Sequence, residues 1–209
     1  MIEYPKIETL YDRDEKTFKV DTTRVRRPEF LLPRSWLVTE KIDGMNARIE
    51  LTGRGTFDLS GRTDKSTLTE DQDLVLSAIA IRALNYFGGE PHPVVLFGEL
   101  YGPKIQSGGW YRNDIAFRLF DVKIGDWWLN WDNVVDVALR IGVETVPVIA
   151  EGMPLEAVLA YVRSPSVVAT LDGGDIYRNQ EGIVARTDPL LLDRSGDRVI
   201  WKLKGKDLA

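Results

Sequence analysis

Short apolar segments divided by turn residues are the feature of this 209-residue chain that most restricts its fold. Each segment has the length of a β-strand, and several alternate apolar and polar residues as a half-buried strand does. Segments of this kind occupy residues 36–42, 46–52, 57–60, 94–100, 115–123, 182–186 and 198–203. The first two flank a tight Asp43-Gly44 turn, which predicts a β-hairpin.

Three other segments have the periodicity of amphipathic helices. They cover residues 71–86, 131–140 and 154–163. Asn130 precedes the second of them and Gly142 follows it, as expected of residues that cap a helix. Because strands outnumber helices, the sequence predicts an α+β fold built on antiparallel sheets and covered by a few surface helices.

The composition is that of an ordinary globular protein, with 44% hydrophobic and 28% charged residues. No apolar run approaches the roughly 18 residues that a membrane helix needs, and the amino-terminal residues lack an apolar signal core. The absence of cysteine excludes disulfides and thiolate chemistry, and the single histidine excludes a histidine-rich metal site. We therefore expect one cytoplasmic domain over residues 1–209, acting as a monomer and not at a membrane.

The net charge of −5 argues weakly against nucleic acid as a partner, because proteins that bind it usually present a basic face. Basic residues nevertheless cluster at residues 24–27 and 202–206. Phosphates respond to the local field, so the whole-chain charge does not decide the question.

Lys41, where a predicted strand runs into the Asp43-Gly44 turn, is the first candidate for chemistry. The amine of a lysine can attack the α-phosphorus of a nucleotide and form a phosphoramidate. To do so it must be neutral, a form that burial or nearby cations favour. Taken alone, the short motif around Lys41 is a weak signal, and a solvated lysine beside a surface turn is the favoured interpretation of it.

Five further segments lie at the ends of predicted strands or within them. They comprise residues 60–63, 97–102, 117–122, 181–184 and 199–204. Together they supply an arginine, an aromatic ring, two carboxylates and two lysines. Carboxylates hold divalent metal ions, cations neutralise charge that develops on a phosphate, and a ring offers a face to a nucleobase.

In this order and spacing the motifs resemble those of the superfamily of DNA ligases, RNA ligases and mRNA capping enzymes, from about Glu40 to Lys204. The resemblance implies the ATP-grasp-like nucleotidyltransferase fold of the ligases, in which two antiparallel β-sheets flank a nucleotide cleft. It also implies ATP and Mg²⁺ (or Mn²⁺) as cofactors and a lysyl-AMP intermediate.

The resemblance assigns roles to single residues. Lys41 is the adenylylated lysine, and Phe120 is the aromatic residue that stacks on the purine. The other cofactor contacts that it implies are those of Glu40, Arg62, Glu99, Lys202 and Lys204. The metal ligands that it implies are Glu181, Glu99 and Asp43.

The residues themselves leave alternatives open for several of these roles. Phe120 lies in an apolar strand and can serve as plain core. Lys202 and Lys204 can form a solvated strand edge, and Glu181 can belong to a simple turn. Glu99 is harder to explain as structure, because it interrupts an apolar strand, where a carboxylate costs free energy unless it is paired or metal-bound.

Two features point to one branch of the superfamily. Asn46, five residues after Lys41, is typical of phage-type RNA ligases of the second kind, whereas DNA ligases carry arginine there. The chain stops five residues after Lys204, so we expect no carboxy-terminal oligonucleotide-binding barrel. Asn46 and Arg48 are expected to contact nucleic acid, with a salt bridge on the strand as the alternative for Arg48.

The sequence therefore predicts an ATP-dependent RNA ligase that adenylylates a 5′-phosphate end and seals it to a 3′-hydroxyl. The alternatives are a minimal ATP-dependent DNA ligase that seals nicks in duplex DNA, and a non-catalytic nucleotide-binding module.

Overall fold

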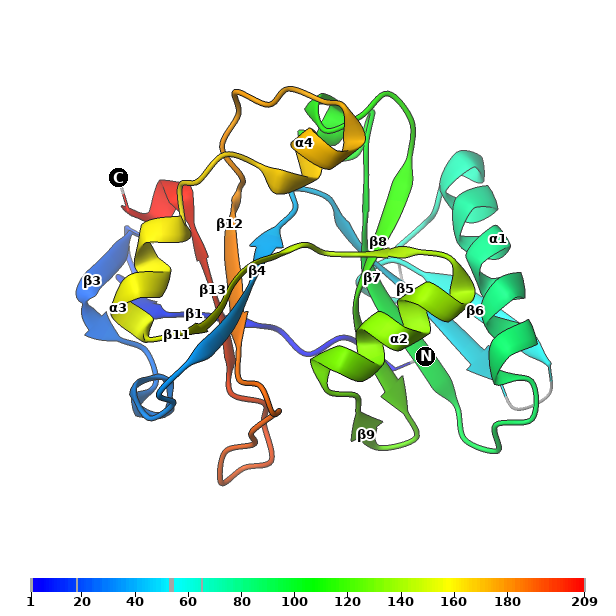
Figure 1. Cartoon of the computed structure of the whole chain (residues 1–209), viewed down its shortest axis with the longest axis horizontal. Coiled ribbons are helices and arrows are strands. Elements are labelled where there is room, and N and C mark those ends of the chain that lie inside the picture. The colour runs from blue at the N-terminus through cyan, green and yellow to red at the C-terminus, as the bar shows by residue number, and fades with distance from the viewer. Residues whose placement is uncertain (1, 18, 53–54, 65, 209) are drawn as a thin grey trace. The chain divides into compact units, whose positions relative to one another are not determined.

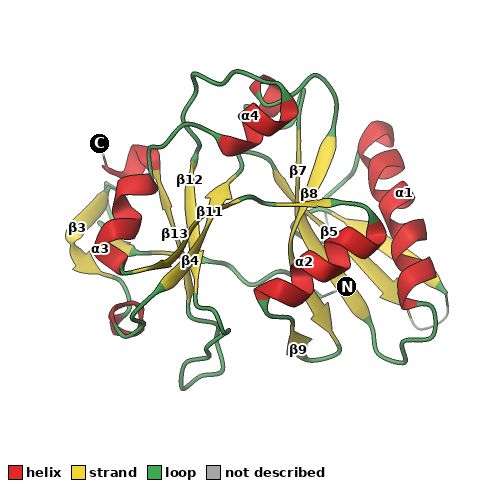
Figure 2. Cartoon of the chain, viewed as in Figure 1, coloured by secondary structure: helices red, strands yellow, loops and turns green. Residues whose placement is uncertain are grey.

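The computed structural model describes residues 2–17, 19–52, 55–64 and 66–208 of the chain. The structure is of the mixed α+β class, as predicted, with several sheets and few helices (Figures 1 and 2). Its described residues divide into two compact units. The first comprises residues 2–5 and 43–146, and the second comprises residues 6–42 and 147–208. The single nucleotidyltransferase domain expected over residues 1–209 stays a prediction.

The first unit is built on a six-stranded sheet in which β10, β8, β7, β5 and β6 follow one another and β9 pairs with β8. The strands are β5 (Met45–Thr52), β6 (Thr56–Ser60), β7 (Val94–Tyr101), β8 (Ala116–Ile124), β9 (Trp127–Trp128) and β10 (Glu144–Thr145). Neighbouring strands are antiparallel, except that β10 runs parallel to β8.

Two long helices, α1 (Glu70–Phe87) and α2 (Trp131–Ile141), pack on this sheet (Figure 1). A capping box starts α1, because the Thr69 hydroxyl accepts from the Gln72 N–H and the Gln72 side chain accepts from the Thr69 N–H. Helix α2 ends at Gly142, which is in the left-handed region at φ 65°. Both helices were predicted from their periodicity, and their ends lie within one residue of the predicted ends.

Alternation along the strands gives this sheet an apolar face and a polar face. The buried apolar residues of β5 and β7 that share one face are Ala47, Ile49, Leu51, Val94, Leu96 and Leu100. Helices bury apolar residues against a sheet, so this is the face that α1 and α2 cover. The intervening residues lie on the opposite face, which carries Asn46, Arg48 and Glu99 together with the buried Val95, Phe97 and Tyr101 and is called the polar face for its charged groups.

The second unit is built on a five-stranded sheet with the order β1, β13, β12, β4, β11. The strands are β1 (Glu8–Thr9), β4 (Trp36–Lys41), β11 (Val148–Met153), β12 (Gly182–Arg186) and β13 (Ile200–Lys204). The central strand β12 is antiparallel to both neighbours, whereas β1 is parallel to β13. The expected antiparallel sheets therefore each have one parallel edge strand.

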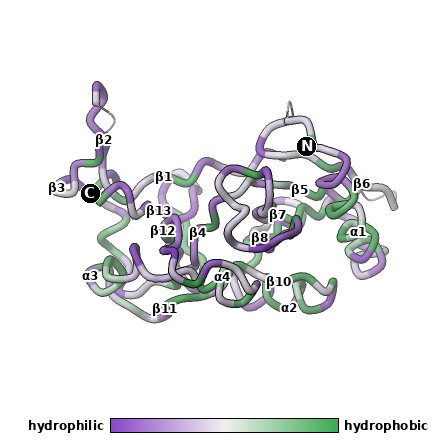
Figure 3. The backbone as a smooth tube through the Cα atoms, turned by 90° about the horizontal axis from the view of Figure 1, so that it is seen from above, coloured by the Kyte–Doolittle hydropathy of each residue, from purple (hydrophilic) through white to green (hydrophobic). Residues whose placement is uncertain are grey.

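Shorter elements surround this second sheet. Strands β2 (Tyr11–Arg13) and β3 (Val20–Val25) form a separate hairpin that is largely hydrophilic (Figure 3). The helices are α3 (Leu155–Val158), α4 (Val167–Asp172) and 3₁₀ turns at Pro28–Leu31, Leu159–Tyr161 and Gly205–Leu208. A further 3₁₀ turn, Gly108–Trp110, belongs to the first unit.

The core of the second unit is formed by alternate residues of β4, β12 and β13. These buried residues are Trp36, Val38, Ile183, Ala185, Trp201 and Leu203. The rings of Trp36 and Trp201 meet edge to face, with their centroids 5.5 Å apart. The opposite face of the same strands carries Thr39, Lys41, Lys202 and Lys204 together with the buried Leu37 and Ile200, and it is called the polar face of this sheet for its charged groups.

All seven predicted strands are present, and the third predicted helix, over residues 154–163, is divided into α3 and a 3₁₀ turn. The predicted hairpin across the Asp43-Gly44 turn is wrong, because β4 pairs with β12 and β11 whereas β5 pairs with β6 and β7 in the other sheet. Strand β11, helix α4 and the amino-terminal strands β1 to β3 were not predicted. None of the helices in the described ranges combines the length and apolar character that crossing a bilayer requires.

Candidate active site

Lys41 is the last residue of β4, and its side chain lies on the polar face of the five-stranded sheet. The register places Lys41 opposite Gly182 of β12, and it places the same glycine opposite Lys204 of β13. Directly opposed residues of antiparallel strands share a face, so the two lysines lie on either side of the glycine. Lys202 precedes Lys204 by two residues and shares that face.

The Glu181 carboxylate joins Lys41 to Lys204. Its Oε2 accepts a hydrogen bond from Lys41 Nζ, and its Oε1 pairs with Lys204 Nζ. The side chains of Glu181, Lys41 and Lys204 are 17%, 20% and 26% exposed, so water screens the pairs only in part. The structure thus brings together three of the residues that the sequence singled out.

The pKa of Glu181 reflects two opposing effects. Burial alone would raise it, but the charge of Lys41 and the hydrogen bonds from Lys204 and Lys41 outweigh burial and hold the pKa below its ordinary value. At neutral pH the Glu181 carboxylate is therefore ionised.

Gly182 allows the close approach of the strands that carry these groups. A Cβ at this position would lie 2.2 Å from the Leu203 carbonyl oxygen and 2.7 Å from Lys204 Cα. Any side chain would push β13 away from β12, and Lys204 would move with it.

Glu40 lies on the other face of β4, because successive residues of a strand point to opposite sides. The residue is 2% exposed, and its carboxylate accepts hydrogen bonds at the start of α4, from Ser166 Oγ (2.6 Å) and from the N–H groups of Val167 (2.8 Å) and Val168 (2.9 Å). A carboxylate is favourable at a helix amino terminus. The prediction that Glu40 binds the cofactor does not fit this side chain, which instead anchors α4 to the sheet.

In the first unit, Glu99 of β7 stands opposite Asn46 of β5 and Arg118 of β8. The three residues form a cross-strand row on the polar face of that sheet. Glu99 is half-buried, and Asn46 Oδ1 is buried with no hydrogen-bond partner among the described residues. The carboxylate that interrupts an apolar strand in the sequence therefore lies beside Asn46 and Arg118, and the buried Phe97 and Tyr101 share its face of β7.

Asp43 and Gly44 form the turn that leads into β5. The Asp43 N–H donates to the Tyr111 hydroxyl (3.0 Å). A Cβ on Gly44 would lie 2.9 Å from Glu99 Cγ and 2.5 Å from the Leu100 carbonyl oxygen. Glycine thus lets the turn pack against the strand that carries Glu99.

Phe120 occupies a β-bulge. The register of β7 with β8 shifts between Phe97 and Gly98, so that Phe120 is the extra residue on β8. Phe120 meets the ring of Tyr4 edge to face, with the centroids 5.1 Å apart, and the Tyr4 hydroxyl donates to the carboxylate of the next residue, Asp121. Phe120 and Asp121, two successive residues, therefore both contact Tyr4, which the regular alternation of a strand would not allow.

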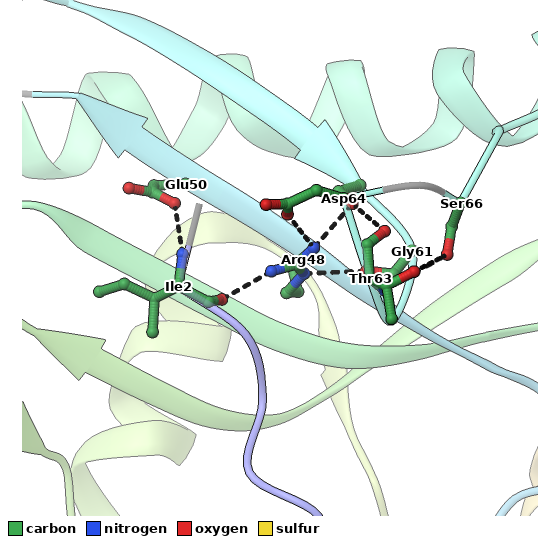
Figure 4. Close-up of polar contacts among 8 residues, drawn as sticks. Ile2, Arg48, Glu50, Gly61, Thr63, Asp64 and Ser66 are labelled. Atoms are coloured by element: carbon green, nitrogen blue, oxygen red, sulfur yellow. Dashed lines mark hydrogen bonds and ion pairs between the residues drawn. The ribbon is translucent and has the colours of Figure 1, made fainter.

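Arg48 is completely buried, with 0% exposure. Its guanidinium donates to the carbonyl oxygens of Ile2 (2.8 Å) and Gly61 (2.8 Å), to Ser60 Oγ (2.8 Å) and to Asp64 Oδ1 (2.7 Å) (Figure 4). The salt-bridge alternative raised for Arg48 agrees with this placement. The prediction that Arg48 contacts nucleic acid does not, because the side chain has no exposed surface.

Arg62 follows Gly61 in the turn that Arg48 holds. Its side chain is exposed, and it makes no hydrogen bond or ion pair with any other described residue. The predicted nucleotide contact of Arg62 is thus compatible with its placement and stays a prediction.

No three histidine, aspartate or glutamate side chains gather into a metal site within the ranges that the structure describes. The predicted ligands are divided between the units, with Asp43 and Glu99 in the first and Glu181 in the second. The set of three carboxylates therefore stays a prediction.

Sequence reasoning missed two residues that contact predicted site residues: Tyr4, which contacts Phe120, and Ser166, which donates to Glu40. The sequence offers no local signal for Tyr4, whose partners lie more than 90 positions away. Ser166 did carry a signal, because serine before a short apolar segment is a common helix cap, and its hydroxyl does accept from the Ala169 N–H.

Comparisons with known proteins show the family. A family model described as RNA ligase matches residues 34–204, which is most of the chain. No curated protein matches the sequence.

Solved structures of Naegleria gruberi RNA ligase are similar in fold. A mutant with ATP and Mn aligns at a TM-score of 0.67 and 18% identity, covering 97% of this chain and 59% of that one. A mutant with AMP and Mn gives 0.64 and 19%, and the protein with PPi gives 0.65 and 19%, each covering 97% of this chain and 60% of the other. The chain thus spans about three fifths of the length of these structures.

Proposed function

Since the chain belongs to the RNA ligase family, we propose that it is an ATP-dependent RNA ligase whose Lys41 forms a lysyl-AMP intermediate. One observation carries the proposal: Lys41 Nζ and Lys204 Nζ share the Glu181 carboxylate on one polar sheet face. This arrangement gathers an amine nucleophile and cations for the α-phosphate. The ATP, AMP and PPi of the Naegleria gruberi structures support the same reaction.

In the first step, Lys41 loses a proton to solvent and its Nζ attacks the α-phosphorus of ATP. A phosphorus–nitrogen bond forms, the bond from the α-phosphorus to the bridging oxygen breaks, and pyrophosphate leaves. Lys204 and Lys202 lie on the same face and neutralise the charge that develops on the α-phosphate. The ion pair with Glu181 holds the Lys41 side chain over this face until the phosphates arrive.

In the later steps the AMP passes to a 5′-phosphate end, and a 3′-hydroxyl then attacks that phosphate and releases AMP. We assign Phe120 to stacking on the adenine, and Arg62 and Glu99 to the sugar and phosphates. Asn46 is assigned to the nucleic-acid end, because its amide can donate to a phosphate oxygen.

We propose that a divalent cation binds together with the nucleotide phosphates. Mg²⁺ in nucleotide sites is usually held by one or two carboxylates together with substrate phosphates. Glu181 supplies one carboxylate, and Glu99 and Asp43 are the further ligands that we propose. When bound, Mg²⁺ or Mn²⁺ would neutralise charge on the phosphates. The Mn of the Naegleria gruberi structures supports this cofactor.

The test is covalent labelling. Incubation with α-³²P-labelled ATP and Mg²⁺ should label the protein, and Lys41→Ala should abolish the label. Lys16→Ala, which removes an exposed lysine, is the matched control and should label normally. Labelling that persists in Lys41→Ala would refute the assignment of the nucleophile, and ATP binding without any adduct would indicate a non-catalytic module.

Matched nicked substrates then identify the strand that is sealed. We expect sealing when the 3′-hydroxyl is on RNA. Efficient sealing by a DNA 3′-hydroxyl would favour the alternative, a minimal DNA ligase.

A further inference from the structure

Arg48 donates most of its hydrogen bonds to one short turn, residues 60–64. Among the described residues, four acceptors surround its guanidinium: three belong to Ser60, Gly61 and Asp64, and the fourth belongs to Ile2 (Figure 4). The hydrogen bond from Arg48 lowers the pKa of Asp64 below its ordinary value. The turn therefore offers Arg48 a charged partner at neutral pH.

Further contacts close the turn around itself. Ser60 Oγ donates to the Thr63 carbonyl oxygen (2.9 Å), and the Thr63 N–H donates to Ser66 Oγ (3.3 Å). A Cβ on Gly61 would lie 2.7 Å from Ser66 Cβ, so the backbone is closely packed here. The turn thus has a fixed shape at the residue just before Arg62.

Arg62 takes no part in this network. Its exposed side chain makes no hydrogen bond or ion pair with the described residues, so its own contacts do not fix its position. Instead, Arg48 of the neighbouring strand β5 fixes the backbone of the turn that carries Arg62, through its hydrogen bonds to Ser60, Gly61 and Asp64. Arg48 stands opposite Ser60 in the register of β5 with β6, which places its guanidinium next to the turn.

If its role were purely structural, a buried arginine would stabilise the fold poorly at this position. Removing a guanidinium from water costs several kcal/mol, and an apolar side chain of similar volume commonly stabilises a fold as well or better. The planar fork of arginine, however, can fix several carbonyl and carboxylate acceptors at defined angles. The geometry favours orientation of the turn as the purpose of the buried charge.

We propose that Arg48 is a positioning residue for Arg62: it holds the turn over residues 60–64 so that Arg62 is presented to the nucleotide. The segment at Ile2 completes the arrangement, because its carbonyl accepts from Arg48 while its N–H donates to Glu50 Oε2 (3.1 Å). This inference rests on the proposed role of Arg62 in binding ATP.

A double-mutant cycle tests it, with Arg48→Lys, Arg62→Ala and the double variant. The measurements are kcat and KM for ATP in steady-state ligation of a nicked substrate. We expect each single variant to raise KM about tenfold with a smaller change in kcat, because a displaced cation weakens nucleotide binding. In the Arg62→Ala background, Arg48→Lys should then add less than about twofold, since the contact that it positions is already gone.

Each other outcome has a distinct meaning. If Arg48→Lys raises KM by the same factor in both backgrounds, Arg48 acts independently of Arg62 and the proposal is wrong. A harmless Arg48→Lys beside a harmful Arg62→Ala also overturns it. A harmless Arg62→Ala overturns both the nucleotide role of Arg62 and this inference, while the labelling result for Lys41→Ala still decides the covalent chemistry.

The melting temperature of each variant is measured alongside its kinetics. Arg140→Lys, a surface change on α2, is the matched control and should alter neither KM nor the melting temperature. Should Arg48→Lys fail to fold, Ser60→Ala takes its place in the cycle, because it removes one acceptor and leaves the guanidinium in place. The same coupling to Arg62→Ala is then expected, and additive effects would again refute the proposal.

Discussion

Replacing Glu181 by glutamine tests the central ion pairs of the candidate site. The substitution keeps the size of the side chain but removes its charge, leaving Lys41 and Lys204 without their shared carboxylate. Hydrogen bonds to charged groups contribute about 1.5–3 kcal/mol when buried, whereas exposed ion pairs contribute about 0–1 kcal/mol. With exposures of 17–26%, these pairs lie between the limits. We expect Glu181→Gln to lower the free energy of unfolding by about 2 kcal/mol at pH 7.

The loss should depend on pH in a defined direction. The folded-state pKa of Glu181 lies below its ordinary value of 4.5, so the carboxylate stabilises the folded state above that value. This contribution disappears as the pH falls through the lowered folded-state pKa, because the wild-type side chain is then protonated too. The difference between wild type and Glu181→Gln should therefore shrink below pH 4.5.

Urea unfolding at pH 7 and at a series of acid pH values measures this difference. Glu151→Gln is the matched control, because Glu151 is exposed and forms no ion pair among the described residues. It should change stability by less than about 0.5 kcal/mol at every pH. A deficit of Glu181→Gln that stays constant as the pH falls, or that is no larger than that of the control at pH 7, would refute the bridged arrangement.

Two further predictions concern residues that support the site. Glu40→Ala should lower the free energy of unfolding by about 3 kcal/mol, because it leaves the N–H groups at the start of α4 unpaired; a variant of unchanged melting temperature that no longer binds ATP would instead support Glu40 as a cofactor contact. Tyr4→Ala should raise KM for ATP about threefold to tenfold by freeing the Phe120 ring, whereas Tyr4→Phe, which keeps the ring, should stay close to wild type; equal effects of the two variants would show that ring contact is not what matters.

Most of the sheet framework was predictable because it depends on local alternation. The segments that became β4 and β12 show it, and it places Lys202 and Lys204 on one face as soon as β13 is recognised. The same alternation separates Glu40 from Lys41. Grouping those two by adjacency in a motif did not take the two-residue period of a strand into account.

The placements of Phe120 and Arg48 were not predictable in this way. The bulge at Phe120 exists only in relation to the register of β7, and no local pattern of β8 reveals it. Arg48 finds its partners 12 to 46 positions away, at Ser60 to Asp64 and at Ile2. Both depend on which segments meet after folding, which is information that a periodicity does not contain.

Because of the bulge, the direction of the Phe120 side chain depends on the number of residues in β8 as well as on the residue type at this position. Deleting a single residue at this point of β8 would let the strand regain an unbroken two-residue period against β7. If the deleted residue were Leu119, Phe120 would take its place opposite Gly98 and turn toward the apolar face that α1 and α2 cover. Alignments that score only residue identity at this position would miss such a loss, so gaps in β8 are where divergent or redesigned versions of this sheet need inspection.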